Sequence, residues 1–356
     1  MLFRRNLSGS TWLSVATLLL GVLILGAAFV APLSAVPRAN DRVVLFPKLV
    51  TGQVLTYQMQ YHADKSAATK STVARSTPQA PSGTETNVRA LLRLEIIGVE
   101  SQGPRSTIRA RTYFQVLNSA THLTVPRDLP TPSDQTQRQD PKGASVEFAI
   151  EADGRIDQIK GLDVLFPEQQ QAWKEWAARF AAAATLPEGG VRIGQKWKTE
   201  EVESSPAPIA KLTWMRESTY LRDEPCHVSE LTIEGDVAAA HPQQVPETCA
   251  VIETNATLKQ RSSTKDATPE DYKLHQLLTS GTASGENKTL LFVSTQTGLL
   301  VRSSDHADQK MSVTIAKADN SNRVHYDIKA KSDTEIFRIA NSPLNTSVTS
   351  PSNPTN

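Results

Sequence analysis

Alternating hydrophobic and polar positions run through most of the chain after Pro37 and predict a protein built mainly of β-strands. The clearest case is a hairpin over 88–116, because two alternating runs flank a turn at Ser101-Gln102-Gly103-Pro104. One face of each run is apolar and the other is charged, which is typical of an antiparallel sheet that covers a core on one side only. The positions predicted to face inward are Val88, Ala90, Leu92, Leu94, Ile96, Ile108, Ala110, Thr112, Phe114 and Val116.

Further strands are predicted over 52–61 and 145–159. In the second of these, Asp153-Gly154 separates two apolar runs and gives the strongest short hairpin signal in the chain. Two segments interrupt the alternation: 63–86 is rich in Ser, Thr, Ala and Pro, and 126–143 is polar and contains proline. We expect both to form surface loops or disordered excursions, because neither has much apolar surface to bury.

One helix is predicted between these strands and those that follow. Pro167 suits a first helical position, and Leu186-Pro187 and Gly189-Gly190 stop the pattern. Two tryptophans on one helical face could line a ligand site, but packing against the sheet explains them more simply. The residues that recur at three- and four-residue spacing are Trp173, Trp176, Ala177, Phe180 and Ala184.

The second part of the chain repeats features of the first. Gly194-Gln195 precedes a strand as Gly52-Gln53 does, and Thr297-Gly298 lies between apolar runs as Asp153-Gly154 does. The interval from Gly52 to Gly154 is 102 residues and that from Gly194 to Gly298 is 104. This spacing predicts two related β-halves, with chance as the alternative. The strands predicted in the second half are 209–220, 227–237, 250–258, 311–316, 323–328 and 335–339.

The predicted fold is therefore mainly β (α+β): a curved antiparallel sheet or open half-barrel, in two repeated β-halves, with one amphipathic helix packed on it. The first half covers 45–160, a bridging helix lies within 161–190, and the second half covers 191–340. The tail over 341–356 has little to bury and is expected to be disordered.

The amino-terminal 36 residues are predicted to form a signal anchor or a signal peptide. Arg4 and Arg5 precede a charge-free run from Trp12 to Ala31, which as a helix would span about 30 Å, the thickness of a bilayer core. A secretory signal is usually shorter and ends at a small-x-small site, which Leu33-Ser34-Ala35 fits poorly. We favour an uncleaved signal anchor over a cleaved signal peptide. We expect the carboxy-terminal domain outside the cytoplasmic membrane, although basic residues lie on both sides of the run.

Charge and motifs argue against several functions. Lys plus Arg (38) nearly equals Asp plus Glu (37), so there is no basic footprint for nucleic acid. No nucleophile elbow, phosphate loop, dinucleotide fingerprint, HExxH or calcium loop is present. Asp305-His306-Ala307-Asp308 is interpreted as a solvated turn rather than a metal site, and His62 and Asp64 are placed at a strand end. No catalytic, cofactor-binding or metal-binding residue is predicted.

The two cysteines, Cys226 and Cys249, constrain the strand map. In an oxidising compartment they could form a disulfide. If 227–237 and 250–258 paired directly as a hairpin, however, the cysteines would lie at opposite ends, and a disulfide needs Cα atoms within about 7 Å. Either these strands are not direct partners or the thiols stay apart.

Several of these segments together resemble bacterial cell-envelope proteins with a curved antiparallel sheet. The resemblance rests on Asp153-Gly154-Arg155-Ile156, on Leu186-Pro187, on 191–197 (VRIGQKW) and on 281–300, and it covers most of 45–340. In outline the chain is similar to periplasmic lipoprotein carriers of the LolA and LppX kind, whose half-barrel encloses acyl chains. No residue-level role transfers, because no binding motif of that family is matched. The chain also lacks a lipobox cysteine near residue 30.

The sequence thus predicts a non-catalytic envelope protein, anchored in the membrane or exported, that binds a hydrophobic ligand or lipid in its concave face. One alternative is an interaction module of an envelope complex that uses exposed sheet edges for strand addition. A less favoured alternative is a hydrolase with a site built from scattered residues. A carrier should have a cavity lined by the inward residues of the 88–116 hairpin.

Overall fold

A computed structural model of the chain describes residues 42–45, 47–71, 82–102, 105–124, 145–151, 155–184, 186–187, 189–203, 207–234, 237–319 and 322–340. The predicted membrane segment 12–31, the loop 126–143, the turn Asp153-Gly154 and the tail 341–356 lie outside these residues. Among the described residues, no helix combines the length and the apolar composition that crossing a bilayer requires.

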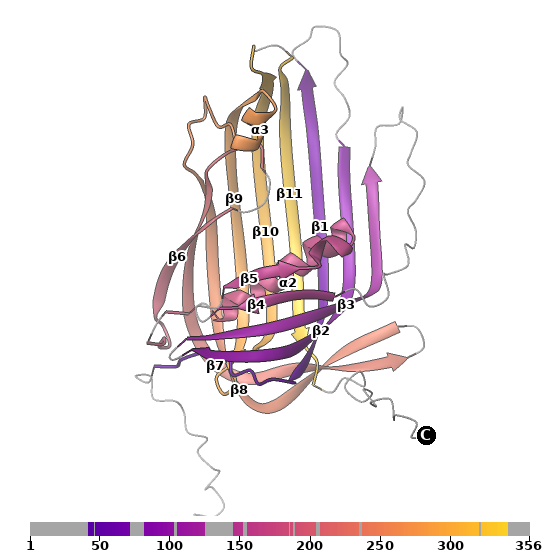
Figure 1. The fold of residues 1–356 in the computed structure, drawn as a ribbon, viewed down its shortest axis with the longest axis vertical. Coiled ribbons are helices and arrows are strands. Elements are labelled where there is room, and N and C mark those ends of the chain that lie inside the picture. Colours follow the sequence, from indigo (N-terminus) through magenta and orange to yellow (C-terminus); the bar gives the residue numbers. More distant parts are fainter. Residues whose placement is uncertain are drawn as a thin grey trace, which may run out of the picture. The chain divides into compact units, whose positions relative to one another are not determined.

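The described strands form a single antiparallel sheet of eleven strands in the order β5-β4-β3-β2-β1-β11-β10-β9-β8-β7-β6 (Figure 1). The sheet ends at β5 and β6 and does not close into a barrel, so the prediction of a mainly β protein with an open curved sheet is confirmed. The strands are β1 (Val54–Ser71), β2 (Ser82–Gln102), β3 (Arg105–Thr124), β4 (Ser145–Ile150), β5 (Ile156–Lys160), β6 (Lys196–Val202), β7 (Leu212–Glu234), β8 (Val237–Gln260), β9 (Leu277–Ser294), β10 (Leu300–Lys317) and β11 (Val324–Arg338).

The two predicted halves meet within this sheet. Strands β1–β5 form one meander and β6–β11 form another, and the first strand pairs with the last through registers such as Tyr61 with Thr334. The residues from Arg42 onward form one compact unit. The halves are therefore two parts of one sheet, and their descent from a repeat stays a prediction.

The starts of the two halves share one local structure. Gly52 and Gly194 both have positive φ angles, 83° and 80°. The amide of Gln53 donates to the Val50 carbonyl, and its side-chain oxygen accepts from the Val50 amide. Gln195 makes the same two bonds with Arg192. Because glycine adopts positive φ without steric strain, Gly-Gln at each start gives the same turn into a strand.

The predicted hairpin over 88–116 is confirmed by the pairing of β2 with β3, but several predicted loops are strands. The segment 63–86 was expected to be a loop; residues 63–71 belong to β1 and 82–86 to β2. Residues 221–226, between two predicted strands, are continuous β7. Residues 63–67 and 83–86 pair with strands on both sides, 68–71 pair with β11 and 222–225 pair with β8, and this pairing outweighs the weak β propensity of Ala, Ser and charged residues.

The predicted helix is confirmed as α2 (Pro167–Ala184), and it packs inside the curve of the sheet. Trp173, Trp176 and Phe180 are at most 2% exposed, so the tryptophan stripe belongs to the core. Trp176 stacks on Phe180 with ring centroids 5.2 Å apart, and Trp173 Nε1 donates to Thr112 Oγ1 at 2.7 Å. Figure 1 shows β2 to β5 passing in front of α2, while β9, β10, β11 and β1 continue well beyond it. Two short helical segments, η1 (Leu162–Val164) and α3 (Glu270–Leu274), lie in connections.

Candidate functional site

The part of the inner face that the sequence predicted as a ligand cavity is filled. Leu92 and Leu94 on β2 and Tyr57 on β1 are fully buried in the same apolar cluster as the α2 tryptophans. Ile96, Ile108 and Ala110 belong to it too. The prediction that the inward residues of the 88–116 hairpin line a cavity is therefore wrong, because α2 occupies that space.

A row of polar side chains crosses the inner face where α2 leaves it. The registers align one residue from each of six consecutive strands at this level, and all of them are buried. The row separates the α2 cluster from a second apolar cluster further along the strands. Its members are Tyr61, Thr334, Asp305, Thr289, Thr254 and Ser218.

The centre of this polar row is a buried ion pair. Arg179 of α2 donates to Asp305 of β10 at 2.7 Å, and their side chains are only 6% and 1% exposed. Asn287 Nδ2 donates to both carboxylate oxygens of Asp305, and the Thr289 hydroxyl donates to one of them. The interpretation of Asp305-His306-Ala307-Asp308 as a solvated turn is therefore wrong: these residues lie in the middle of β10, which alternates between a buried and an exposed face.

Glu175 of α2 also belongs to this network. Its carboxylate accepts from Arg179 at 3.3 Å, one helical turn away. Burial raises the pKa of the Glu175 carboxyl, and the neighbouring Asp305 charge raises it further, whereas Arg179 lowers it. The helix thus carries both a cation that neutralises Asp305 and a carboxyl that is poorly solvated when ionised.

Beyond the polar row, α2 no longer covers the inner face; among the described residues most inward side chains there are apolar, but Ser332, Gln309 and Thr69 are polar. We call this surface the uncovered inner face. Its side chains are partly exposed, although every second residue on these strands points to the same side as the core. Among the described inward positions of β1, Lys65 is the one that carries a charge. The surface consists of Ala67 on β1, Ala283 on β9, Ala307 and Met311 on β10, and Tyr326, Ile328 and Ala330 on β11.

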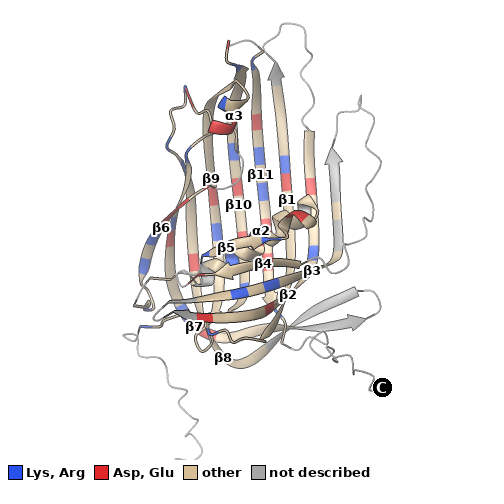
Figure 2. Cartoon of the chain, viewed as in Figure 1, with Lys and Arg blue, Asp and Glu red and all other residues tan. Residues whose placement is uncertain are grey.

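The other side of the same strands is strongly polar. Figure 2 shows charged residues of both signs along β1, β9, β10 and β11. Several form cross-strand or same-strand pairs, such as His306 with Asp333 at 2.7 Å and Lys310 with Asp308 at 3.5 Å. Beyond the polar row, these strands are therefore amphipathic, which normally means that the apolar face is covered.

Among the described residues, the uncovered inner face is flanked by packed protein on its β7 side. Leu212 and Trp214 of β7 pack with Leu258, Val313 and the connection residues Ile209 and Ala267 in the second apolar cluster. Trp214 Nε1 donates to Glu203 at 2.8 Å, which fixes the indole over this cluster. Met311, Tyr326 and Ile328 contact the cluster at its margin and remain partly exposed on the side toward β1.

A hollow of about 600 Å³ lies on the outer face, opposite the polar row. Its lining is rich in titratable groups of both signs: His62, Arg89, Lys288, His306, Asp333 and Glu335. Hydrogen bonds to Asn87 and Asp64 raise the pKa of His62, which lies in the middle of β1 rather than at a strand end as predicted. Ser304 also lines the hollow. A serine nucleophile would need a histidine within hydrogen-bond reach, and among the described residues no hydrogen bond joins Ser304 to His306.

Cys226 and Cys249 are joined by a disulfide with a Cα–Cα distance of 5.0 Å. The hairpin considered from the sequence does not form, because 250–258 pairs with the first part of β7 and 227–234 pairs with 237–244. A register shift between Pro225 and His227 brings Cys226 level with the Cys249 region. The bridge is buried with Val228 and Val301 in a small cluster on the outer face.

Comparison with known proteins gives only distant structural likeness. No protein-family model and no curated protein matches the sequence. A solved structure of lipid–protein interactions in lipovitellin is similar with a TM-score of 0.36 and 10% identity over 82% of this chain. The match covers 25% of the lipovitellin chain, so this chain spans about a quarter of that protein. OpdL of Pseudomonas aeruginosa is similar with a TM-score of 0.19 and 6% identity over 81% of this chain, and 99% of OpdL is covered.

Proposed function

We propose that the protein is a non-catalytic binding protein of the cell envelope, held at the membrane or exported through residues 12–31. In this proposal, the uncovered inner face holds an apolar ligand such as the acyl chains of a lipid. The observation that carries it is the largely apolar inner face that continues past α2 on β10, β11 and β1, while the outward positions of the same strands are largely charged or polar. Exposed apolar surface of this kind marks a site for a ligand or partner.

The dimensions of the surface fit one acyl chain. Ala330 and Val324 are six residues apart on β11, which corresponds to about 20 Å at the rise of an antiparallel strand. One leaflet of a bilayer's hydrocarbon core is about 15 Å thick, or half of about 30 Å. Since each buried methylene contributes about 0.8 kcal/mol, a chain lying along β11 would gain appreciable affinity from this face.

The two edge strands of the sheet favour binding of a ligand on the face of the sheet over addition of a partner strand at its edge. The edge strand β5 has five residues, and Gln158 within it has a positive φ of 52°. The other edge strand, β6, has the sequence KWKTEEV and carries charges of both signs. Short, irregular or charged edges are devices that discourage pairing with another strand.

Photo-crosslinking in intact cells tests this function. Bacterial cells that produce the full-length chain are fed a photoactivatable, clickable fatty acid, and the crosslinked peptides are mapped by mass spectrometry. We expect crosslinks at 307–315 and 324–330. They should be lost in Ile328→Glu and kept in Lys329→Glu, a control at the next residue of β11, which points to the outer face.

Limited proteolysis checks that both variants fold. Crosslinks confined to 12–31, or equal labelling of the two variants, would refute a lipid site on the inner face.

A further inference from the structure

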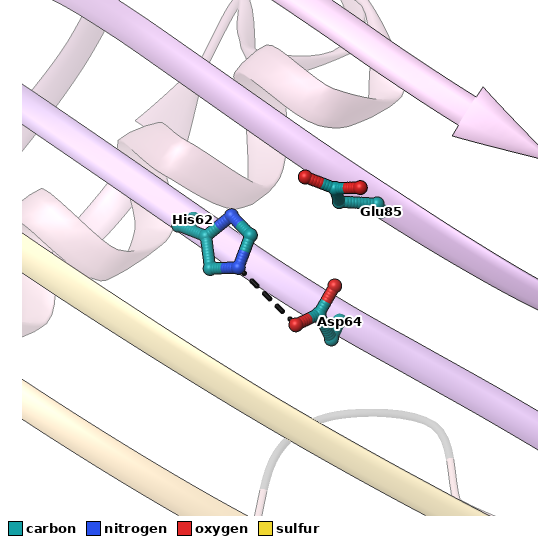
Figure 3. A group of neighbouring side chains, drawn as sticks. All are labelled: His62, Asp64 and Glu85. Atoms are coloured by element: carbon teal, nitrogen blue, oxygen red, sulfur yellow. Dashed lines mark hydrogen bonds and ion pairs between the residues drawn. The ribbon is translucent and has the colours of Figure 1, made fainter.

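Three side chains that can bind a metal ion converge on the outer face of β1 and β2. His62 and Asp64 are two residues apart on β1 and therefore point to the same side, and Glu85 of β2 lies directly opposite Asp64 (Figure 3). One ligand atom from each lies within 4.8 Å of the others. Among the described residues, no other set of three or more His, Cys, Asp or Glu side chains lies this close together.

Asn87 orients two of the three side chains. Its Oδ1 lies 2.6 Å from His62 Nδ1, and its Nδ2 donates to Glu85 Oε1 at 3.0 Å. Because the amide oxygen can only accept, His62 Nδ1 carries the proton in this bond. A hydrogen bond of this type to the distal ring nitrogen is the usual support of a metal-bound histidine.

The other ring nitrogen of His62 meets a carboxylate. Nε2 lies 3.2 Å from Asp64 Oδ2. In the neutral imidazole with its proton on Nδ1, a lone pair would face a carboxylate oxygen, so a cation between the two atoms is favourable. Glu85 brings a second carboxylate oxygen within 4.8 Å of a ligand atom of His62 and of Asp64.

We propose that His62 Nε2 and the carboxylates of Asp64 and Glu85 bind a divalent transition-metal ion such as Zn²⁺. One imidazole and two carboxylates form a donor set of the kind that such ions accept, and three protein ligands leave a position for water or a small ligand. Of the proposed ligands, His62 lines the outer hollow, as does its partner Asn87. This inference is independent of lipid binding on the inner face.

The chain contains a matched control on the same face. His306 and Asp333 pair across β10 and β11 at 2.7 Å, and both line the same hollow. This pair has one histidine and one carboxylate facing each other, but it is not part of a group of three ligands within the described residues. If any exposed His–Asp pair were enough to bind the metal, both sites would bind it. If three ligands are needed, only the site at His62, Asp64 and Glu85 should bind it.

Metal titration of the full-length chain tests the proposal. After treatment with a chelator, the protein is titrated with Zn²⁺ by calorimetry and with Co²⁺ by visible absorption, whose d–d bands report ligand number. We expect one ion per chain. Binding should be lost in His62→Ala and Glu85→Gln and unchanged in His306→Ala. Asn87→Ala should weaken binding by about 10–100-fold, because it removes only the support of the ligands.

Circular dichroism confirms that each variant is folded, which these partly or fully exposed positions should allow. Absence of a saturable site, or equal losses in His62→Ala and His306→Ala, would overturn the proposal.

Discussion

The buried pair between Arg179 and Asp305 gives the sharpest stability prediction. Both side chains are nearly inaccessible, and removal of one partner from a buried pair typically costs about 3–5 kcal/mol because the other charge stays buried. In Asp305→Ala, Arg179 keeps its bond to Glu175, which reduces the loss, but Asn287 and Thr289 lose an acceptor, which increases it. We expect the free energy of unfolding to fall by about 4 kcal/mol.

Urea unfolding followed by tryptophan fluorescence measures this loss, because Trp173 and Trp176 lie in the α2 core. The double variant Arg179→Met/Asp305→Ala removes both charges and should be more stable than the sum of the losses in Arg179→Met and Asp305→Ala predicts, by about 1–3 kcal/mol. A loss below about 1 kcal/mol in Asp305→Ala, or strict additivity in the double variant, would show that the pair does not hold α2 against the sheet.

Three further predictions use the same unfolding assay. Replacing both cysteines by serine should lower stability by about 3 kcal/mol, since the bridge closes a loop of 23 residues, and a reductant should have the same effect. The pKa of Glu175 is raised by burial, so its stabilising protonated form is lost as pH rises above the normal glutamate range. Glu175→Gln should flatten that decline, and an unchanged pH profile would contradict it. Gly161→Ala should cost about 1–3 kcal/mol, because φ is 79° and a Cβ would lie 2.5 Å from Ser145 O. Gly98→Ala, with nothing within 4 Å, is the control and should be neutral.

The sequence pattern predicted the strands and the helix whose conformation is favoured by their own residues. The alternation of Val88 to Ile96 predicted a strand with one buried face, and Pro167 predicted the first residue of α2. Residues 63–71 were missed because Ala, Ser and Lys have no strand preference of their own. They form a strand because β11 pairs with all of them and β2 pairs with 63–67.

The candidate sites depend on contacts between residues far apart in the chain, which the sequence does not reveal. Asp305 looked like part of a polar turn because its partner, Arg179, is on a helix over a hundred residues away. His62 and Asp64 were noticed together, but Glu85 becomes their neighbour only through the register of β1 with β2. The sequence left two outcomes open for Cys226 and Cys249, and the register of β7 with β8 shows the first of them: 227–234 and 250–258 are not direct partners, so the disulfide forms.

The polar row also explains why α2 leaves part of the inner face open. To cover Met311 on β10, the helix would have to move about 20 Å along the strand from the level of Asp305, a distance of six residues. That movement would take Arg179 away from Asp305 and leave a carboxylate buried without its cation. It would also separate Trp173 Nε1 from Thr112. The position of α2 is therefore fixed by specific polar contacts, and these leave the largely apolar surface beyond it without cover from α2.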